Sequence, residues 1–110
     1  MKIESAYADG KVRLYLSGEL DHHAARVVMT DIEEKLDLLL PRDCVLDFRD
    51  VSFMDSSGIA VIMKTYRRVN AIGGRLWVEN VPPQPMKVLD ASGIGRLIEI
   101  SALVQVRRRT

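Results

Sequence analysis

The sequence has little cysteine and no long apolar segment. Cys44 is the only cysteine among 110 residues, which excludes an internal disulfide, and its apolar neighbours predict a buried, inert thiol. No uncharged apolar run approaches the roughly 20 residues that a membrane-spanning helix needs. The first residues, Met1 to Ser5, contain no apolar stretch of the signal-sequence type. We therefore expect a cytoplasmic protein without a membrane partner.

The chain also lacks an excess of charge of either sign. The formal net charge of +1 gives no bulk reason to expect binding to nucleic acid or to an anionic membrane. The only dense basic run, 107–109, is expected to be a solvated tail. The two histidines, His22 and His23, are adjacent, and adjacent side chains on a helix point apart. Without a cysteine cluster beside them we expect no metal site, and nothing in the residues requires a cofactor.

The composition that remains is that of an ordinary folded domain. Hydrophobic residues make up 47% of the chain and charged residues 28%, which is enough to form a core and argues against disorder. A chain of 110 residues fits one domain and leaves little room for two. We therefore expect one domain over residues 1–110.

Strand and helix patterns alternate along the chain. Polar and apolar residues alternate over 11–17, which predicts a strand with one solvated face, and the turn signal Asp9-Gly10 predicts an antiparallel partner over 3–8. Further strands are expected at 44–48, 75–79 and 97–100. Helices are expected after a cap near Asp21, after residues 55–58, over 85–91 and, frayed, over 102–106.

The order of these elements predicts an α/β domain. A strand, a helix and a strand between residues 44 and 79 predict a parallel unit with a right-handed crossover. The mostly apolar strand at 44–48 is typical of a sheet covered on both faces, and residues 49–54 are expected to form a loop. The predicted fold is a mixed sheet of four to five strands with helices packed against it.

Two serines occupy the expected start of the second helix. Ser56 and Ser57 follow Asp55 where a strand-end loop becomes helical. The first turn of a helix has unpaired N–H groups and a partial positive charge, which stabilise a phosphate. Most serines and aspartates in this position are only helix caps, and Phe53 and Met54 would then be core or staple residues. The residues alone therefore do not decide between a cap and a phosphorylation site.

Four motifs carry a resemblance to a known family. They are Gly-Glu-Leu-Asp-His-His-Ala at 18–24, Ser-Phe-Met-Asp-Ser-Ser-Gly at 52–58, Ile-Gly-Gly at 72–74 and Asp-Ala-Ser-Gly-Ile at 90–94. Their order and spacing resemble those of the anti-anti-sigma factors, above all the sporulation type, within a wider group of domains shared with sulfate transporters. The likeness covers nearly the whole chain, and the first two motifs together are specific.

This resemblance implies a binding module and not an enzyme. In that family the serine directly after the aspartate is phosphorylated, which corresponds to Ser56, and Ser57 would be a helix-capping neighbour. The unmodified protein would bind an anti-sigma factor that is also a serine kinase, and so release a sigma factor, while a phosphatase would reverse the phosphorylation. The implied contact surface consists of Asp21, His22, His23, Phe53, Met54, Asp55, Ser57 and Gly58.

Gly58 leads to a separate expectation. A glycine just inside a helix costs about 0.5–1 kcal/mol relative to alanine. We therefore expect the small size of Gly58 to let a partner backbone approach the serines. On this hypothesis Gly58→Ala leaves stability equal or better and weakens binding.

Other functions compete with this one. The same fold could act as a stress-signalling scaffold or as a regulatory module of a transporter, but such relatives can lack the aspartate–serine pair that stands here at 55–56. A hydrolase would need a Gly-x-Ser-x-Gly elbow, which neither Ser56 nor Ser57 has. A phosphoacceptor receiver domain could use Asp47 or Asp50, but Asp9-Gly10 does not supply the acidic pair expected after its first strand.

Overall fold

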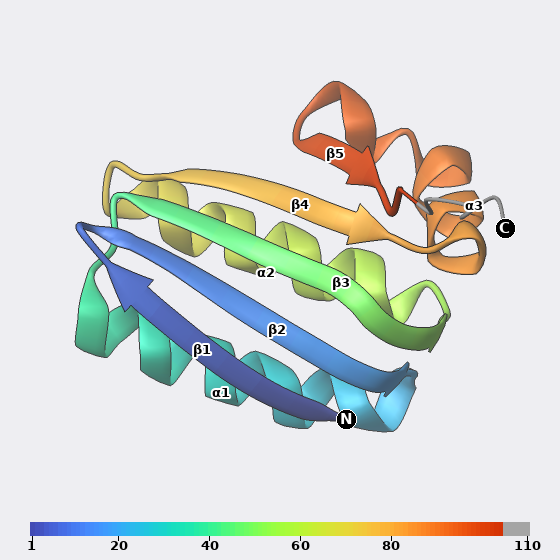
Figure 1. The fold of residues 1–110 in the computed structure, drawn as a ribbon, viewed down its shortest axis with the longest axis horizontal. Helices are drawn as coiled ribbons and strands as arrows, with labels where there is room; N and C mark the ends of the chain where they lie inside the picture. Colours follow the sequence, from blue (N-terminus) through green and yellow to red (C-terminus); the bar gives the residue numbers. More distant parts are fainter. Residues whose placement is uncertain (105–110) are drawn as a thin grey trace, which may run out of the picture.

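A computed structural model describes residues 1–104 and confirms the predicted α/β class (Figure 1). In chain order the elements are β1 (Lys2–Ala8), β2 (Lys11–Leu20), α1 (His22–Leu39), β3 (Asp43–Met54), α2 (Ser57–Ala71), β4 (Arg75–Val81), α3 (Pro83–Ser92), a 3₁₀ turn (Ile94–Arg96) and β5 (Glu99–Ala102).

The five strands form one mixed sheet in the order β1-β2-β3-β4-β5. Strand β1 pairs antiparallel with β2, and the turn residues Asp9 and Gly10 have φ values of 51° and 79°, which confirms the predicted hairpin. The remaining neighbours pair in parallel, because α1, α2 and finally α3 with the 3₁₀ turn each return the chain so that the next strand runs in the same direction. The carboxyl ends of β2 and β3 therefore lie side by side.

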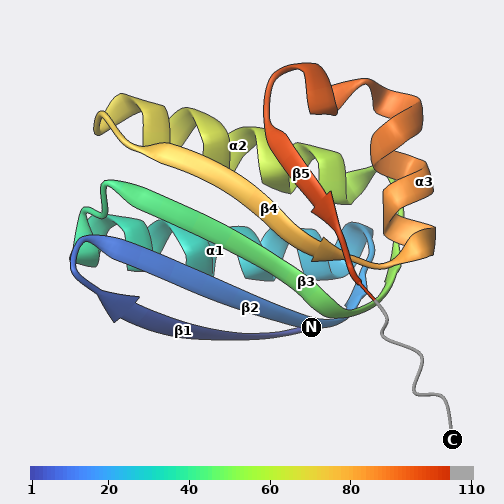
Figure 2. The same cartoon turned by 45° about the horizontal axis from the view of Figure 1, so that its top comes forward.

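Helices α1 and α2 cover one face of the sheet, while α3 lies beside the carboxyl ends of β3 and β4 (Figure 2). Cys44, Leu46 and Phe48 are buried in the core under these helices. The expectation that this strand is covered on both faces is wrong. Asp47, on the opposite face, is buried by polar neighbours of the sheet itself and not by a second helical layer.

The apolar stripes that predicted the helices form the core. Buried residues recur at a spacing of four positions on both long helices, Val28, Ile32 and Leu36 on α1 and Val61, Thr65 and Val69 on α2. Cys44 is buried as expected, and loss of solvent raises its pKa to about 12. The thiol therefore remains protonated and unreactive at neutral pH.

An ionic network crosses the helix-free face of the sheet. The guanidinium of Arg13 on β2 donates to Asp47 on β3 at 3.0 Å and to Glu79 on β4 at 2.9 Å. The side-chain amide of Asn80 also donates to Asp47 at 3.0 Å. Burial opposes the charge on Arg13, but hydrogen bonds and the attraction of both carboxylates outweigh it, so its pKa is raised. Both carboxylate oxygens of Asp47 thus accept hydrogen bonds, and those from Arg13 and Asn80 join β3 to its two neighbouring strands.

Two predicted boundaries are wrong. The segment expected as a loop, 49–54, continues β3 to Met54 and stays paired with β2. Two register shifts allow this pairing, because β3 has one extra residue between Asp47 and Asp50 and another between Val51 and Phe53. The expected terminal helix is also absent as far as the structure describes that segment, since Ala102 belongs to β5, and 103–104 are not helical. Residues 105–106 of that prediction lie outside the described part. Within residues 1–104, no helix combines the length and the apolar character needed to cross a membrane.

Candidate functional site

Ser56 occupies the N-cap position of α2, directly after the turn that leaves β3. Its side chain is exposed and makes no capping hydrogen bond. The hydroxyl is therefore free to react. A phosphate on it would lie at the amino end of a 15-residue helix, where the free N–H groups and the helix dipole favour an anion.

The side chain of Asp55, and not that of Ser57, caps the amino end of α2. The Asp55 carboxylate accepts the backbone N–H of Ser57 at 2.8 Å, which is the bond a capping side chain makes. The expectation that Ser57 caps the helix is wrong, since Ser57 is the first helical residue. Asp55 fixes the backbone beside Ser56, so the serine hydroxyl stays unbonded.

Met54 is fully buried, so it cannot touch a partner and is removed from the predicted contact surface. Gln84 holds its backbone from the first turn of α3. The Met54 N–H donates to the Gln84 side-chain oxygen and the Gln84 amide donates to the Met54 carbonyl, both at 2.9 Å. Sequence reasoning missed Gln84, because nothing in the pattern pairs it with a residue 30 positions away.

Replacing Gln84 tests whether this clamp, the pair of hydrogen bonds between the Gln84 side chain and the Met54 backbone, stabilises the fold. Gln84→Ala leaves two backbone groups of Met54 without partners, which costs about 1–3 kcal/mol where water cannot replace them. Gln84→Glu is the matched control, because a carboxylate still accepts the Met54 N–H but cannot donate to its carbonyl. We expect unfolding free energies in the order wild type, Gln84→Glu, Gln84→Ala by urea denaturation. Equal stability of all three would show that the clamp is not structural.

Asp21 is the N-cap of α1, where the sequence predicts a cap at Asp21 or a neighbouring residue. Its carboxylate accepts the backbone N–H of Ala24 at 2.9 Å, and this hydrogen bond lowers its pKa below the ordinary 3.8. A lowered pKa means that the cap stabilises the fold above the ordinary value and that the effect is lost as pH falls through the folded-state value. Asp21 therefore shapes the start of α1 beside the serine loop.

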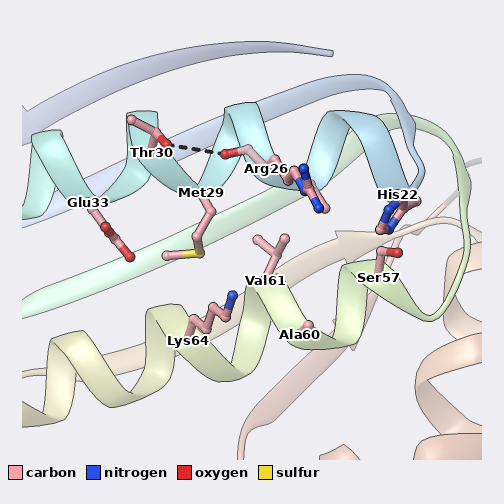
Figure 3. A pocket seen from close by; sticks show the side chains of 10 residues that line it. His22, Arg26, Met29, Thr30, Glu33, Ser57, Ala60, Val61 and Lys64 are labelled. Atoms are coloured by element: carbon pink, nitrogen blue, oxygen red, sulfur yellow. Dashed lines mark hydrogen bonds between the residues drawn. The ribbon is translucent and has the colours of Figure 1, made fainter.

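His22 and His23 are both exposed at the amino end of α1, but they line different hollows of the surface. His22 lines a groove of about 390 Å³ between α1 and α2, where its ring lies close to Ser57 (Figure 3). His23 lines a separate hollow with Met1 and Glu19. Over residues 1–104 no three His, Cys, Asp or Glu side chains gather in a way that could hold a metal ion.

Gly58 has a structural role that differs from the one expected. It is buried, and a Cβ added to it would lie 2.3 Å from the sulfur of Met54 and 3.1 Å from a methyl carbon of Leu20. The small size of Gly58 makes room for the core and not for a partner backbone. This crowding contradicts the prediction that Gly58→Ala leaves stability equal or better.

The corrected expectation is that Gly58→Ala is destabilising. Overpacking of a filled core costs about 1–3 kcal/mol. The clash is with Met54, so the Gly58→Ala/Met54→Ala double variant should lose less stability than the two single losses added together. Denaturation of the four proteins of this double-mutant cycle measures the coupling, and strict additivity would contradict the assigned contact.

The structure thus gathers most of the predicted site at one end of the sheet. Exposed side chains there are His22, His23, Phe53 and Ser56, and Asp55 and Ser57 are partly exposed. Phe53 is 42% exposed, which is unusual for a large apolar side chain in a strand. Asp21 is partly exposed as well, and Met54 and Gly58 are buried beneath this surface.

Comparison with known proteins gives a consistent result. A model of the STAS domain matches residues 2–106. The "Anti-sigma F factor antagonist" of Paenibacillus polymyxa is 33% identical over 96% of this chain and 95% of its own length. The "Anti-sigma-B factor antagonist" of Bacillus subtilis is 32% identical over 86% of this chain and 84% of its own length.

Solved structures agree with the sequence comparison. The unphosphorylated form of the anti-sigma factor antagonist SpoIIAA has a TM-score of 0.77 and 29% identity, covering 90% of this chain and 87% of that chain. The phosphorylated form of SpoIIAA from Bacillus has a TM-score of 0.66 at the same identity, covering 90% of both chains. The murine anion transporter Slc26a9 shares the fold at 16% identity and a TM-score of 0.75, over 90% of this chain and 17% of that chain.

Proposed function

Because the chain belongs to the STAS domain family, we propose that it is a cytoplasmic anti-sigma factor antagonist, a binding module that is switched off by phosphorylation of Ser56. Two curated relatives above 30% identity with this name support the proposal. The observation that carries it is the state of Ser56, an exposed serine at a helix start with no capping hydrogen bond.

The proposed cycle has two states. Without phosphate, the protein binds an anti-sigma factor that is also a serine kinase, and a sigma factor is released. The kinase transfers the γ-phosphoryl group of ATP to the Ser56 hydroxyl, and binding ends. A phosphatase removes the phosphate and restores the binding form.

The contact surface surrounds Ser56. Its exposed members are His22, His23 and Phe53, with Asp55 and Ser57 at the base of the loop. A dianion placed among these groups would face the partner directly, and it adds about −1.5 to −2 charge beside Asp55.

The site of phosphorylation is tested by mass spectrometry. After incubation with the anti-sigma kinase and ATP, the phosphate should be on Ser56, because the Ser56 hydroxyl is exposed whereas Ser57 is partly buried in the groove beside His22. Ser56→Ala should take up no phosphate, and Ser57→Ala should take up as much as wild type. Phosphate found mainly on Ser57 would refute the assignment.

A further inference from the structure

A second hollow, of about 490 Å³, lies between α2 and α3 on the side of Ser56 away from the His22 groove. Ile59 of α2 and Val88 and Ala91 of α3 give it an apolar lining. The polar residues that complete it are Ser56, Lys87 and Ser92. The hollow is therefore continuous with the surface that the proposed switch modifies.

Few polar groups of this hollow are free to bind a ligand. The Ser92 hydroxyl is already used, because it donates to the Leu89 carbonyl at 2.6 Å and accepts the Ile94 N–H at 3.1 Å. Lys87 is exposed and forms no ion pair with any residue in the described range 1–104. An apolar hollow with one free hydroxyl and one free ammonium group fits an apolar side chain that lies beside a carboxylate.

We propose that this hollow docks an apolar side chain of the anti-sigma factor and that Lys87 binds a neighbouring carboxylate of the same partner. The inference rests on the proposed function and adds the chemistry of the partner segment. Charge complementarity supports the carboxylate, since Lys87 is a cation without a partner at the rim of an apolar surface.

The same contact accounts for the direction of the switch. A phosphate on Ser56 would lie at the rim of the hollow that Lys87 also lines. The phosphate would attract the Lys87 ammonium group and repel the partner carboxylate, so one modification would remove the favourable charge pair and add an unfavourable one.

The groove between α1 and α2 provides matched controls on α2, the helix next to α3. It is lined by Ala60 and Lys64, which are both exposed like Ala91 and Lys87. It also contains Arg26 and Glu33, so a carboxylate there would meet charges of both signs, whereas Lys87 is the one charged residue that lines the α2–α3 hollow. Each substitution in the α2–α3 hollow can therefore be compared with the same substitution in the α1–α2 groove.

Calorimetric titration with the purified anti-sigma factor of the source organism tests the inference. Ala91→Arg fills the hollow and should weaken binding about tenfold or more. Ala60→Arg, whose groove is also lined by the contact residues His22 and Ser57, should weaken binding less than Ala91→Arg does. Lys87→Ala should weaken binding about threefold to tenfold and make the affinity less dependent on salt, and Lys64→Ala should do neither. Thermal melts confirm that all four variants are folded.

The outcomes separate this inference from the proposed function. If wild type binds and Ser56→Asp does not, while Ala91→Arg and Lys87→Ala bind like wild type, the docking inference is wrong and the function stands. Loss of binding in Ala60→Arg but not in Ala91→Arg would place the partner in the other groove and overturn the inference. Failure of the folded wild type to bind would overturn both.

Discussion

Ser56→Asp should bind the anti-sigma factor at least about 30-fold more weakly than wild type, because a mismatched charge in a desolvated contact costs about 2–5 kcal/mol. Its melting temperature should stay close to that of wild type. Ser56 is exposed and its side chain makes no bond that the substitution would break. A carboxylate at the amino end of α2 is favoured by the helix dipole.

Two controls separate charge at this position from charge in general. Ser56→Ala should bind the partner normally and resist inactivation by kinase and ATP. Ser52→Asp adds the same charge at an exposed position of β3, four residues earlier, and should change the affinity less than about threefold. If Ser56→Asp unfolded, or bound as tightly as wild type, the electrostatic explanation of the switch would be wrong.

Arg13→Met should lower the free energy of unfolding by about 2–3 kcal/mol. Removing one partner of a buried ion pair costs about 3–5 kcal/mol, and this value is reduced here because the Arg13 and Glu79 side chains are 26% and 34% exposed. The variant leaves Asp47, whose side chain is 7% exposed, without its cation and close to a second carboxylate. Chemical denaturation at neutral pH measures the loss.

The surface pair of Arg68 and Asp37 is the control for this effect. Both side chains are far more exposed, at 44% and 65%, and pairs of this kind contribute about 0–1 kcal/mol. Arg68→Met should therefore change stability by less than about 1 kcal/mol. Equal losses in the two variants would show that the network of Arg13, Asp47 and Glu79 contributes no more to stability than an exposed surface pair does.

Local patterns made much of the fold predictable. The alternation over 11–17 and the turn at Asp9-Gly10 specify the hairpin of β1 and β2, because each depends only on neighbouring residues. The same holds for the cap at Asp21 and for the apolar stripes of α1 and α2. Ser56 could be chosen only with the help of the family resemblance, since the physical features of its segment also suit an ordinary cap.

The errors concern contacts between distant segments. Two register shifts, each with an extra residue on β3, let this strand stay paired with β2 beyond its apolar run, and no local rule signals them. The clamp from Gln84 and the packing of Gly58 against Met54 depend on where separate elements meet. The sequence does not reveal that one face of the sheet carries no helix. The ionic network around Asp47 buries that part of β3, so the strand has the apolar, buried character of one that is covered by helices on both faces.

The most direct test of the switch compares the protein with and without one phosphate. The purified anti-sigma factor is titrated calorimetrically with unmodified protein and with protein fully phosphorylated on Ser56, at the same salt concentration. The unmodified form should bind, and the phosphorylated form should bind at least about 30-fold more weakly while its circular dichroism spectrum and melting temperature stay unchanged. Equal affinity of the two forms, or a phosphorylated form that has lost its fold, would contradict the account.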